Sequence, residues 1–195
     1  VGRNAQNPPG DLSLRVSRSS NRRCFIISKK FARRGSSRSN IVEARASIQA
    51  ALNFEADEQW QQAIDAYNDA LAALPETETT KRQQLQLARA NARIHVGELP
   101  EAMFAMERLL VETAEGKDRE LEAKVRASLA SAQYYTGWLM RLELAEKKEW
   151  KEPLEKARQN FRLLAEQTAK ADAKASEDHQ NNLEAVVRLA RMDLS

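Results

Sequence analysis

Two histidines and one cysteine are the residues of this sequence best suited to catalysis or metal binding. His95 and His179 lie 84 residues apart, and Cys24 lies in a segment rich in serine and arginine. A zinc site needs three or four ligands held together, and neither histidine has another ligand at a suitable spacing. Cys24 has no positioned base, which a cysteine nucleophile requires. We therefore expect no metal, no cofactor and no catalytic residue, and we predict that the chain is not an enzyme.

The carboxylates do not change this expectation. Acidic residues are grouped at positions 55–58 and 76–78, in stretches that read as loops, where solvated acids favour solubility. The sequence has no glycine-rich phosphate-binding loop. The chemistry that remains is non-covalent binding by helix surfaces.

Composition favours an all-α protein. The 195 residues include only six glycines and five prolines, and 30% are charged. Beyond residue 40 there is no convincing alternation of apolar and polar residues, and good helix formers dominate. We predict two parts: a disordered basic tail over residues 1–40 and a helical domain over residues 41–195.

The charge is distributed unevenly between these parts. Residues 1–40 hold ten Lys/Arg and one acid, a net charge of +9, whereas residues 41–195 hold 21 bases and 27 acids, a net charge of −6. A nucleic-acid-binding body would usually carry a basic face, so we do not expect one here. The longest apolar run of the tail, Cys24 to Ile27, is too short to span a membrane.

The tail allows three interpretations. Its Ser/Arg-rich composition resembles an organellar transit peptide, and it could also be a basic arm that binds nucleic acid or anionic lipid. The chain starts with Val and its first methionine is Met103. From this we expect a non-functional extension, with a cytoplasmic protein, and an organelle as the alternative location.

Helix signals divide the body into seven segments. Asn40 and Thr80 each precede an acid or amide by three residues, the spacing of a capping box. Pro75 should end one helix, Gly97 should occupy a left-handed C-cap, and Pro100 fits a first helical turn. The predicted helices cover residues 40–56, 59–74, 80–96, 100–114, 118–148, 153–168 and 178–193. Gly137 falls inside the fifth, where it either breaks the helix or admits a close neighbour.

Small and large residues recur at fixed offsets in the first four helices. Ala51 and Ala63 are separated by twelve residues, and so are Ala90 and Ala102. This pattern resembles the tetratricopeptide repeat, in which small residues let two antiparallel helices cross closely and large ones fill the space to the next hairpin. The match is good over 47–75, fair over 86–110 and degenerate afterwards. The repeat positions are Ala51, Phe54, Trp60, Ala63, Tyr67, Ala70, Pro75, Ala90, Gly97, Ala102 and Met106.

The resemblance implies a fold and a binding face. The fold is a short right-handed solenoid of stacked antiparallel hairpins with a C-terminal capping helix. The first helix of each hairpin would line a concave groove for a partner peptide or helix, although the lysines of the family's carboxylate clamp are missing. On that resemblance the groove residues are Arg45, Ile48, Gln49, Leu52, Gln84, Leu87, Asn91, Ile94 and His95.

These observations predict a non-catalytic adaptor or scaffold that binds a protein or peptide through the concave face. One alternative is a structural homo-oligomer that self-associates through the hairpin over 118–168. Another is an organellar assembly factor with a cleaved leader. The aromatics Tyr134, Tyr135 and Trp138 could form a recognition platform, but aromatics at helical spacing more often belong to a core, and we expect them to pack inside.

Overall fold

The computed structural model describes residues 40–116, 118–169 and 172–192. Within these residues the only regular elements are helices, which confirms the all-α prediction. The predicted tail over residues 1–40, including Cys24, lies outside the described residues except for Asn40. The helices cover residues 40–56, α2 (Trp60–Ala73), α3 (Thr79–His95), α4 (Leu99–Ala114), α5 (Arg119–Leu142), α6 (Lys147–Thr168) and α7 (Ala173–Arg191).

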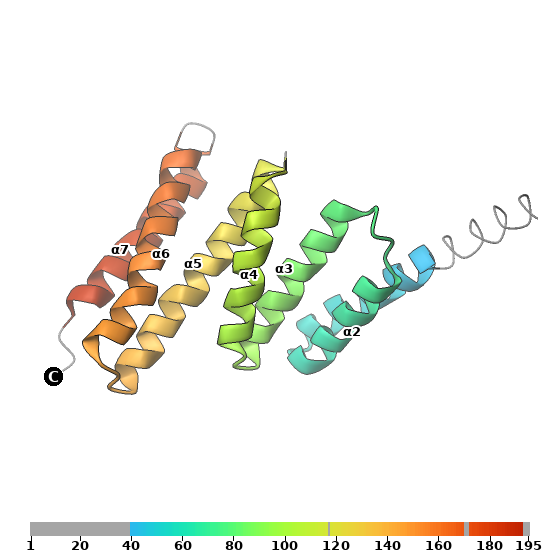
Figure 1. Ribbon diagram of the computed structural model, residues 1–195, viewed down its shortest axis with the longest axis horizontal. Coiled ribbons are helices and arrows are strands. Elements are labelled where there is room, and N and C mark those ends of the chain that lie inside the picture. The colour runs from blue at the N-terminus through green and yellow to red at the C-terminus, as the bar shows by residue number, and fades with distance from the viewer. Residues whose placement is uncertain (1–39, 117, 170–171, 193–195) are drawn as a thin grey trace, which may run out of the picture. The chain divides into compact units, whose positions relative to one another are not determined.

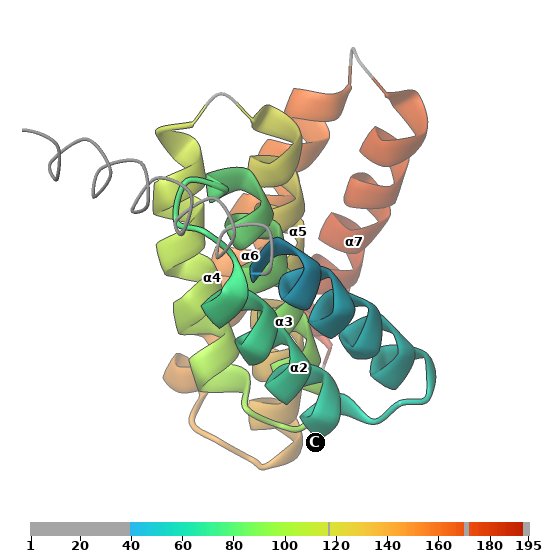
Figure 2. The same ribbon diagram turned by 90° about the vertical axis from the view of Figure 1, so that its right-hand side faces the viewer.

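Consecutive helices pack against each other along the chain. Each of α2 to α6 contacts the next helix, and α3 also touches α5 directly. Figures 1 and 2 show the result, a row of helical hairpins joined by short connections. This arrangement is consistent with a repeat-like helical fold.

Three apolar clusters form the core of the described residues. The first joins the helix at 40–56 to α2 and α3, the second joins α3, α4 and α5, and the third joins α5, α6 and α7. The helices α3 and α5 therefore each contribute to two clusters. Because α3 and α5 are apolar on two sides, each of them lies between neighbouring helices.

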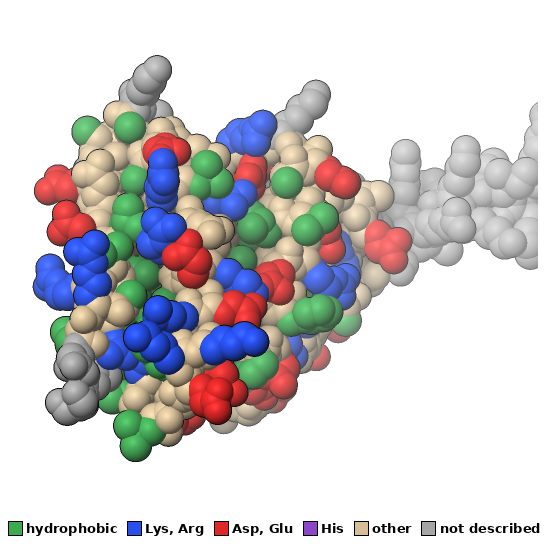
Figure 3. Space-filling model, turned by 60° about the vertical axis from the view of Figure 1, so that its left-hand side comes forward, with side chains coloured by type: hydrophobic (Ala, Val, Ile, Leu, Met, Phe, Trp, Pro, Cys, Tyr) green, Lys and Arg blue, Asp and Glu red, His purple; other side chains and the backbone are tan. Residues whose placement is uncertain are grey.

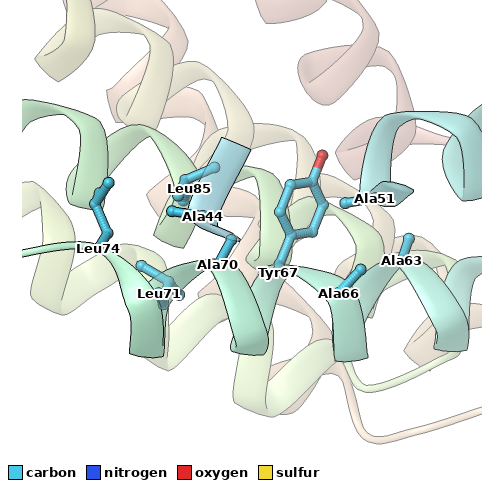
Figure 4. Close-up of a cluster of buried hydrophobic side chains, with 9 residues drawn as sticks. All are labelled: Ala44, Ala51, Ala63, Ala66, Tyr67, Ala70, Leu71, Leu74 and Leu85. Carbon is cyan, nitrogen blue, oxygen red and sulfur yellow. The ribbon is translucent and has the colours of Figure 1, made fainter. Parts of the chain in front are cut away.

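The first cluster is built from alanines around one large ring (Figure 4). The Tyr67 ring rises from α2 beside Ala51 of the preceding helix, and Ala63 and Ala70 lie on the same side of α2. All three alanines are fully buried. Burial, and the neighbouring carboxylate of Glu55, raise the pKa of Tyr67 well above its ordinary value, so the phenol stays neutral.

Gly137 admits a close neighbour and does not break α5. A Cβ atom added there would lie 2.6 Å from Cγ and Cδ2 of Leu154 and 3.2 Å from the carbonyl oxygen of Trp150. The absence of a side chain at Gly137 therefore lets α6 approach the backbone of α5.

Three helices end in the same backbone turn. Glu58, Gly97 and Leu144 all have positive φ, at 56°, 85° and 59°. In each case the next residue donates its N–H back across the turn, as Glu98 does to the carbonyl of Arg93 at 3.0 Å. This six-to-one hydrogen bond is the Schellman motif. The prediction for Gly97 is confirmed, and the motifs at Glu58 and Leu144 carry no glycine signal.

Several predicted helix boundaries are wrong. Asn40 is already helical, and the residue that caps α3 is Glu78, so neither predicted capping box forms at the N-cap. The fifth helix ends at Leu142 and not near residue 148, because the chain turns at Leu144. Pro153 lies inside α6, six residues after it begins at Lys147, and not at its start.

The last helix also begins earlier than predicted. It starts at Ala173, where Asp172 accepts a hydrogen bond from the N–H of Ala175 at 3.0 Å. An aspartate at this position satisfies one of the free N–H groups of a first turn. Residues 173–177 are therefore helical, ahead of the predicted start at residue 178.

Two arginines satisfy carbonyl groups at the ends of neighbouring helices. Arg82 donates to the carbonyls of Leu71 and Leu74, both at 2.8 Å, where Pro75 has stopped α2 as predicted. Arg141 donates to the carbonyls of Leu189 and Met192 at the end of α7. Cations near a helix C-terminus also interact favourably with its dipole. Each arginine thereby links one helix to the end of another.

Candidate functional site

The residues predicted to bind a partner lie on helices that each begin a hairpin. We call this surface the first-helix face and define it as the outward residues of the helix at 40–56, of α3 and of α5. Five of the predicted residues are exposed on it: Arg45, Gln49, Leu52, Gln84 and His95. Asn91 is half-buried.

Three predicted groove residues contribute more to the core than to an open surface. Ile48 is partly buried against the first cluster, Leu87 is buried in the second, and Ile94 is partly buried against the second. Apolar side chains of α3 point toward α4 and α5 because the helix packs on both, and this removes them from solvent. Of the three, only Leu87 also lines the pocket between α3 and α5.

A shallow pocket lies on the first-helix face between α3 and α5. Its volume is about 290 Å³, and it brings together Gln84, Leu87 and Asn91 of α3 with Leu121 and Lys124 of α5. None of the side-chain hydrogen bonds between described residues involves the Asn91 amide. A free amide beside an apolar floor can bind the backbone of another chain while side chains of that chain contact the leucines.

The charged residues around this pocket are largely engaged with each other. Asp118 caps α5 by accepting the N–H of Leu121 at 3.0 Å. Lys124 donates to Glu120 at 2.6 Å, and this hydrogen bond raises the pKa of Lys124. The pocket therefore offers hydrogen bonds and apolar contact more than a net charge.

A buried polar network fixes α5 relative to α6. Glu122 is buried and lies 3.0 Å from the guanidinium nitrogens of both Arg119 and Arg126. Arg126 continues to the Asn160 side-chain oxygen at 3.2 Å, and Asn160 donates to the buried Gln133 at 3.0 Å. The hydrogen bond from Arg126, opposed by burial and aided by Arg119, lowers the pKa of Glu122. Arg126 Nε has no hydrogen-bond partner among the described residues, but the bonds from Arg126 to Glu122 and Asn160 join α5 to α6 and restrict how these two helices can pack.

His95 is the last residue of α3 and contacts the aromatic ring of Trp60. Its imidazole stacks on the indole of Trp60, with ring centroids 3.8 Å apart and planes 9° apart. His95 is exposed, as a groove residue must be, but one of its ring faces is covered by Trp60. It therefore marks one end of the first-helix face.

An exposed aromatic pair on α5 was not among the predicted site residues. Tyr135 and Trp138 are 41% and 37% exposed and stack at 5.6 Å, and Leu142 beside them is 52% exposed. Their spacing from Lys124 places all of them on one side of the helix. The expectation that these aromatics pack inside is wrong for Tyr135 and Trp138, although Tyr134 is partly buried against the third cluster. Periodicity alone could not separate them, because α5 has apolar residues on more than two sides.

The repeat positions have the burial that close helix crossings require. Ala63 and Ala102 have no exposed area, and Gly97 is exposed at a helix end. Phe54, Trp60 and Pro75 are half-buried. The fully or almost fully buried positions are Ala51, Tyr67, Ala70, Ala90 and Met106.

Comparison of the sequence with known protein families, curated proteins and solved structures finds no match. Among the described residues, no three or more His, Cys, Asp and Glu side chains are grouped so as to hold a metal ion. No helix in the described part of the chain is long and apolar enough to cross a membrane. The site is therefore characterised by its geometry alone, and that geometry consists of a pocket, a free amide and exposed aromatic rings.

Proposed function

We propose that the chain is a non-catalytic protein–protein interaction module that binds a peptide or helix of a partner on the first-helix face. The observation that carries this proposal is the pocket between α3 and α5, where Asn91 and Gln84 meet Lys124 over a floor of Leu87 and Leu121. A partner backbone would hydrogen-bond to the Asn91 amide, and its apolar side chains would contact the floor.

The exposed aromatic pair supports the same proposal. Tyr135, Trp138 and Leu142 extend the face along α5 beyond Lys124. Exposed aromatic rings are typical of interface residues with large binding contributions. A partner segment that starts at the pocket and follows α5 would cover them.

The resemblance to tetratricopeptide repeats indicates which side of the helices would bind the partner. In such arrays the first helix of each hairpin lines the concave, ligand-binding side. The buried alanines at the crossings, Ala63 and Ala102, are what that alignment requires. The proposed location is the cytoplasm, and an organelle remains the alternative if residues 1–40 are a transit peptide.

A quantitative pull-down tests the proposal. Full-length protein is used as bait in a lysate of its source, and captured proteins are compared by mass spectrometry between wild type and two variants. Asn91→Arg fills the pocket, and Trp138→Ala removes half of the aromatic pair. The control is Phe104→Ala, at an exposed position of α4. The proposal requires a partner that both face variants lose and the control retains; a capture profile that Asn91→Arg leaves unchanged contradicts it.

A second candidate function is self-association through the α5–α6 hairpin. The stacked and exposed pair Tyr135–Trp138 favours it, since an aromatic patch of this kind can be covered by a second copy. Sedimentation equilibrium distinguishes the two candidates. A mass twice that of the 22.0 kDa chain, which returns to the monomer mass in Trp138→Glu, supports the oligomer.

A further inference from the structure

A groove separate from the first-helix face lies between α6 and α7. Its volume is about 820 Å³, and its floor is apolar: Leu154 of α6 and Val186 of α7 are almost fully buried, with Val187 and Ala190 closer to the surface. A second hollow of about 630 Å³ lies beside the first along α7 and shares Val187 and Arg191 with it. Between Leu183 and Ala190, α7 thus carries apolar residues that the rest of the described chain covers only in part.

The two hollows are lined by five Lys and Arg residues and by three acids, so their rim carries a positive net charge. Lys148, Lys151 and Arg191 line the first hollow and Arg188 lines the second. None of these four forms an ion pair with another described residue. Figure 3 shows Lys and Arg side chains gathered around apolar ones on this end of the molecule.

The acids on the same rim are mostly engaged. Glu155 accepts two hydrogen bonds from the guanidinium of Arg158, at 2.6 and 2.8 Å, and these lower the pKa of Glu155 to about 2. Glu152 lies 2.9 Å from the ammonium of Lys156. Only Glu184, in the second hollow, has no such partner among the described residues. The rim therefore attracts negative charge.

The packing order of the helices indicates what shape fits the groove. Each of α3 to α6 has a helix packed on either side of it, whereas α7 packs mainly on α6. Another helix laid against α6 and α7 would continue the row. The groove spans about three turns of α6, from Lys148 to Arg158, which suits a helix of similar length.

We propose that this groove binds an acidic amphipathic helix of a partner protein, with the apolar side of that helix on Leu154, Val186 and Val187 and its acids against Lys148, Lys151 and Arg191. A second copy fits less well, since a twofold contact would place the basic rim against itself. A lipid surface also fits less well, because the floor residues are recessed and cannot insert into a bilayer.

A selection experiment tests this proposal on the full chain. Phage that display a library of single-helix peptides are first depleted on Ala190→Trp, which fills the groove, and are then selected on wild type. The expected survivors have apolar residues at helical spacing and a net negative charge. Reversing two rim charges, in Lys148→Glu/Lys151→Glu, should weaken their binding about tenfold, whereas Phe104→Glu on α4 should leave it unchanged. Survivors that are neutral or basic, or that ignore the charge reversal, overturn the proposal, and so does the absence of survivors.

Two further measurements address the other occupants. Lys148 and Lys151 are exposed, so their variant should fold even if Ala190→Trp does not, and circular dichroism checks both. Sedimentation of the protein with phosphatidylserine-containing vesicles, if lost in Lys148→Glu/Lys151→Glu, would assign the rim to a membrane and overturn the proposal. A wild-type dimer that Ala190→Trp converts to a monomer would assign the groove to a second copy and also overturn it.

Discussion

The indole of Trp60 and the imidazole of His95 stack face to face, with centroids 3.8 Å apart, and so connect the start of α2 to the end of α3. These residues are 35 positions apart in the chain. The contact closes one end of the first hairpin against the second, at the edge of the first-helix face.

A double-mutant cycle should measure this contact. Trp60→Ala, His95→Ala and the double variant are compared by urea denaturation. We expect a coupling free energy of about 0.5–1.5 kcal/mol, the range for stacked aromatic pairs beyond their burial. The control pair is Trp60 with Phe104, which is exposed on α4 and should give no coupling. Additive effects of Trp60→Ala and His95→Ala would show that the stack contributes nothing.

Gly137→Ala should destabilise the protein although it improves helix propensity. Alanine is better than glycine in a helix by about 1 kcal/mol, but here its Cβ would lie 2.6 Å from Leu154. Overpacking of this kind costs about 1–3 kcal/mol, so the net effect on the free energy of unfolding should be a loss. Leu154→Ala in the same chain should remove the clash, and the double variant should then be more stable than the sum of the single effects. A rise in melting temperature for Gly137→Ala alone would contradict the close approach of α5 and α6.

How much of the fold follows from the sequence depends on which residues carry a local signal. Pro75 and Gly97 predict the ends of α2 and α3. Proline cannot continue a helix, and glycine tolerates the positive φ of a helix C-terminus. Leu144 ends α5 with the same turn as Gly97 but without glycine, so the fifth helix was predicted too long. The sequence predicts Pro153 at a helix start, yet α6 accommodates it inside.

The candidate site was harder to predict than the helices. Asn91 and Gln84 were identified by their repeat positions and do lie together in a pocket. Tyr135 and Trp138 were assigned to a core because helical spacing does not reveal which of several apolar sides of α5 is covered. The groove between α6 and α7 depends on tertiary contacts and has no signal in a single helix.

Leu144→Gly should raise stability. Leu144 has φ of 59° and is 87% exposed, so its side chain contributes little packing to offset the strain of the left-handed conformation. Relief of that strain, reduced by the entropy of glycine, should increase the free energy of unfolding by up to about 1 kcal/mol. Gly97→Ala, in the matching turn, should lower it by a similar amount. If Leu144→Gly instead lowers the free energy of unfolding, as Gly97→Ala does, the left-handed turn at Leu144 is contradicted.

Glu122→Gln should make stability less dependent on pH. The pKa of Glu122 is lowered in the folded state, so its ionised form contributes stability above the unfolded-state value of about 4.3. That contribution is lost as the pH falls through the folded-state pKa. At pH 7 the variant should be less stable by about 1–3 kcal/mol, and the difference should disappear in acid. Glu120→Gln, at an exposed position, is the control. If the difference in free energy of unfolding between wild type and Glu122→Gln persists at low pH, ionisation of Glu122 is not its cause.

Site-specific photo-crosslinking tests the proposed binding face most directly. Benzoylphenylalanine is placed at position 91, in the pocket between α3 and α5, or at position 104, on the exposed side of α4, and each protein is irradiated in a lysate of its source. A partner segment bound to the first-helix face should crosslink at position 91 and not at position 104. Crosslinks that form only at position 104, or equally at both positions, would contradict the account.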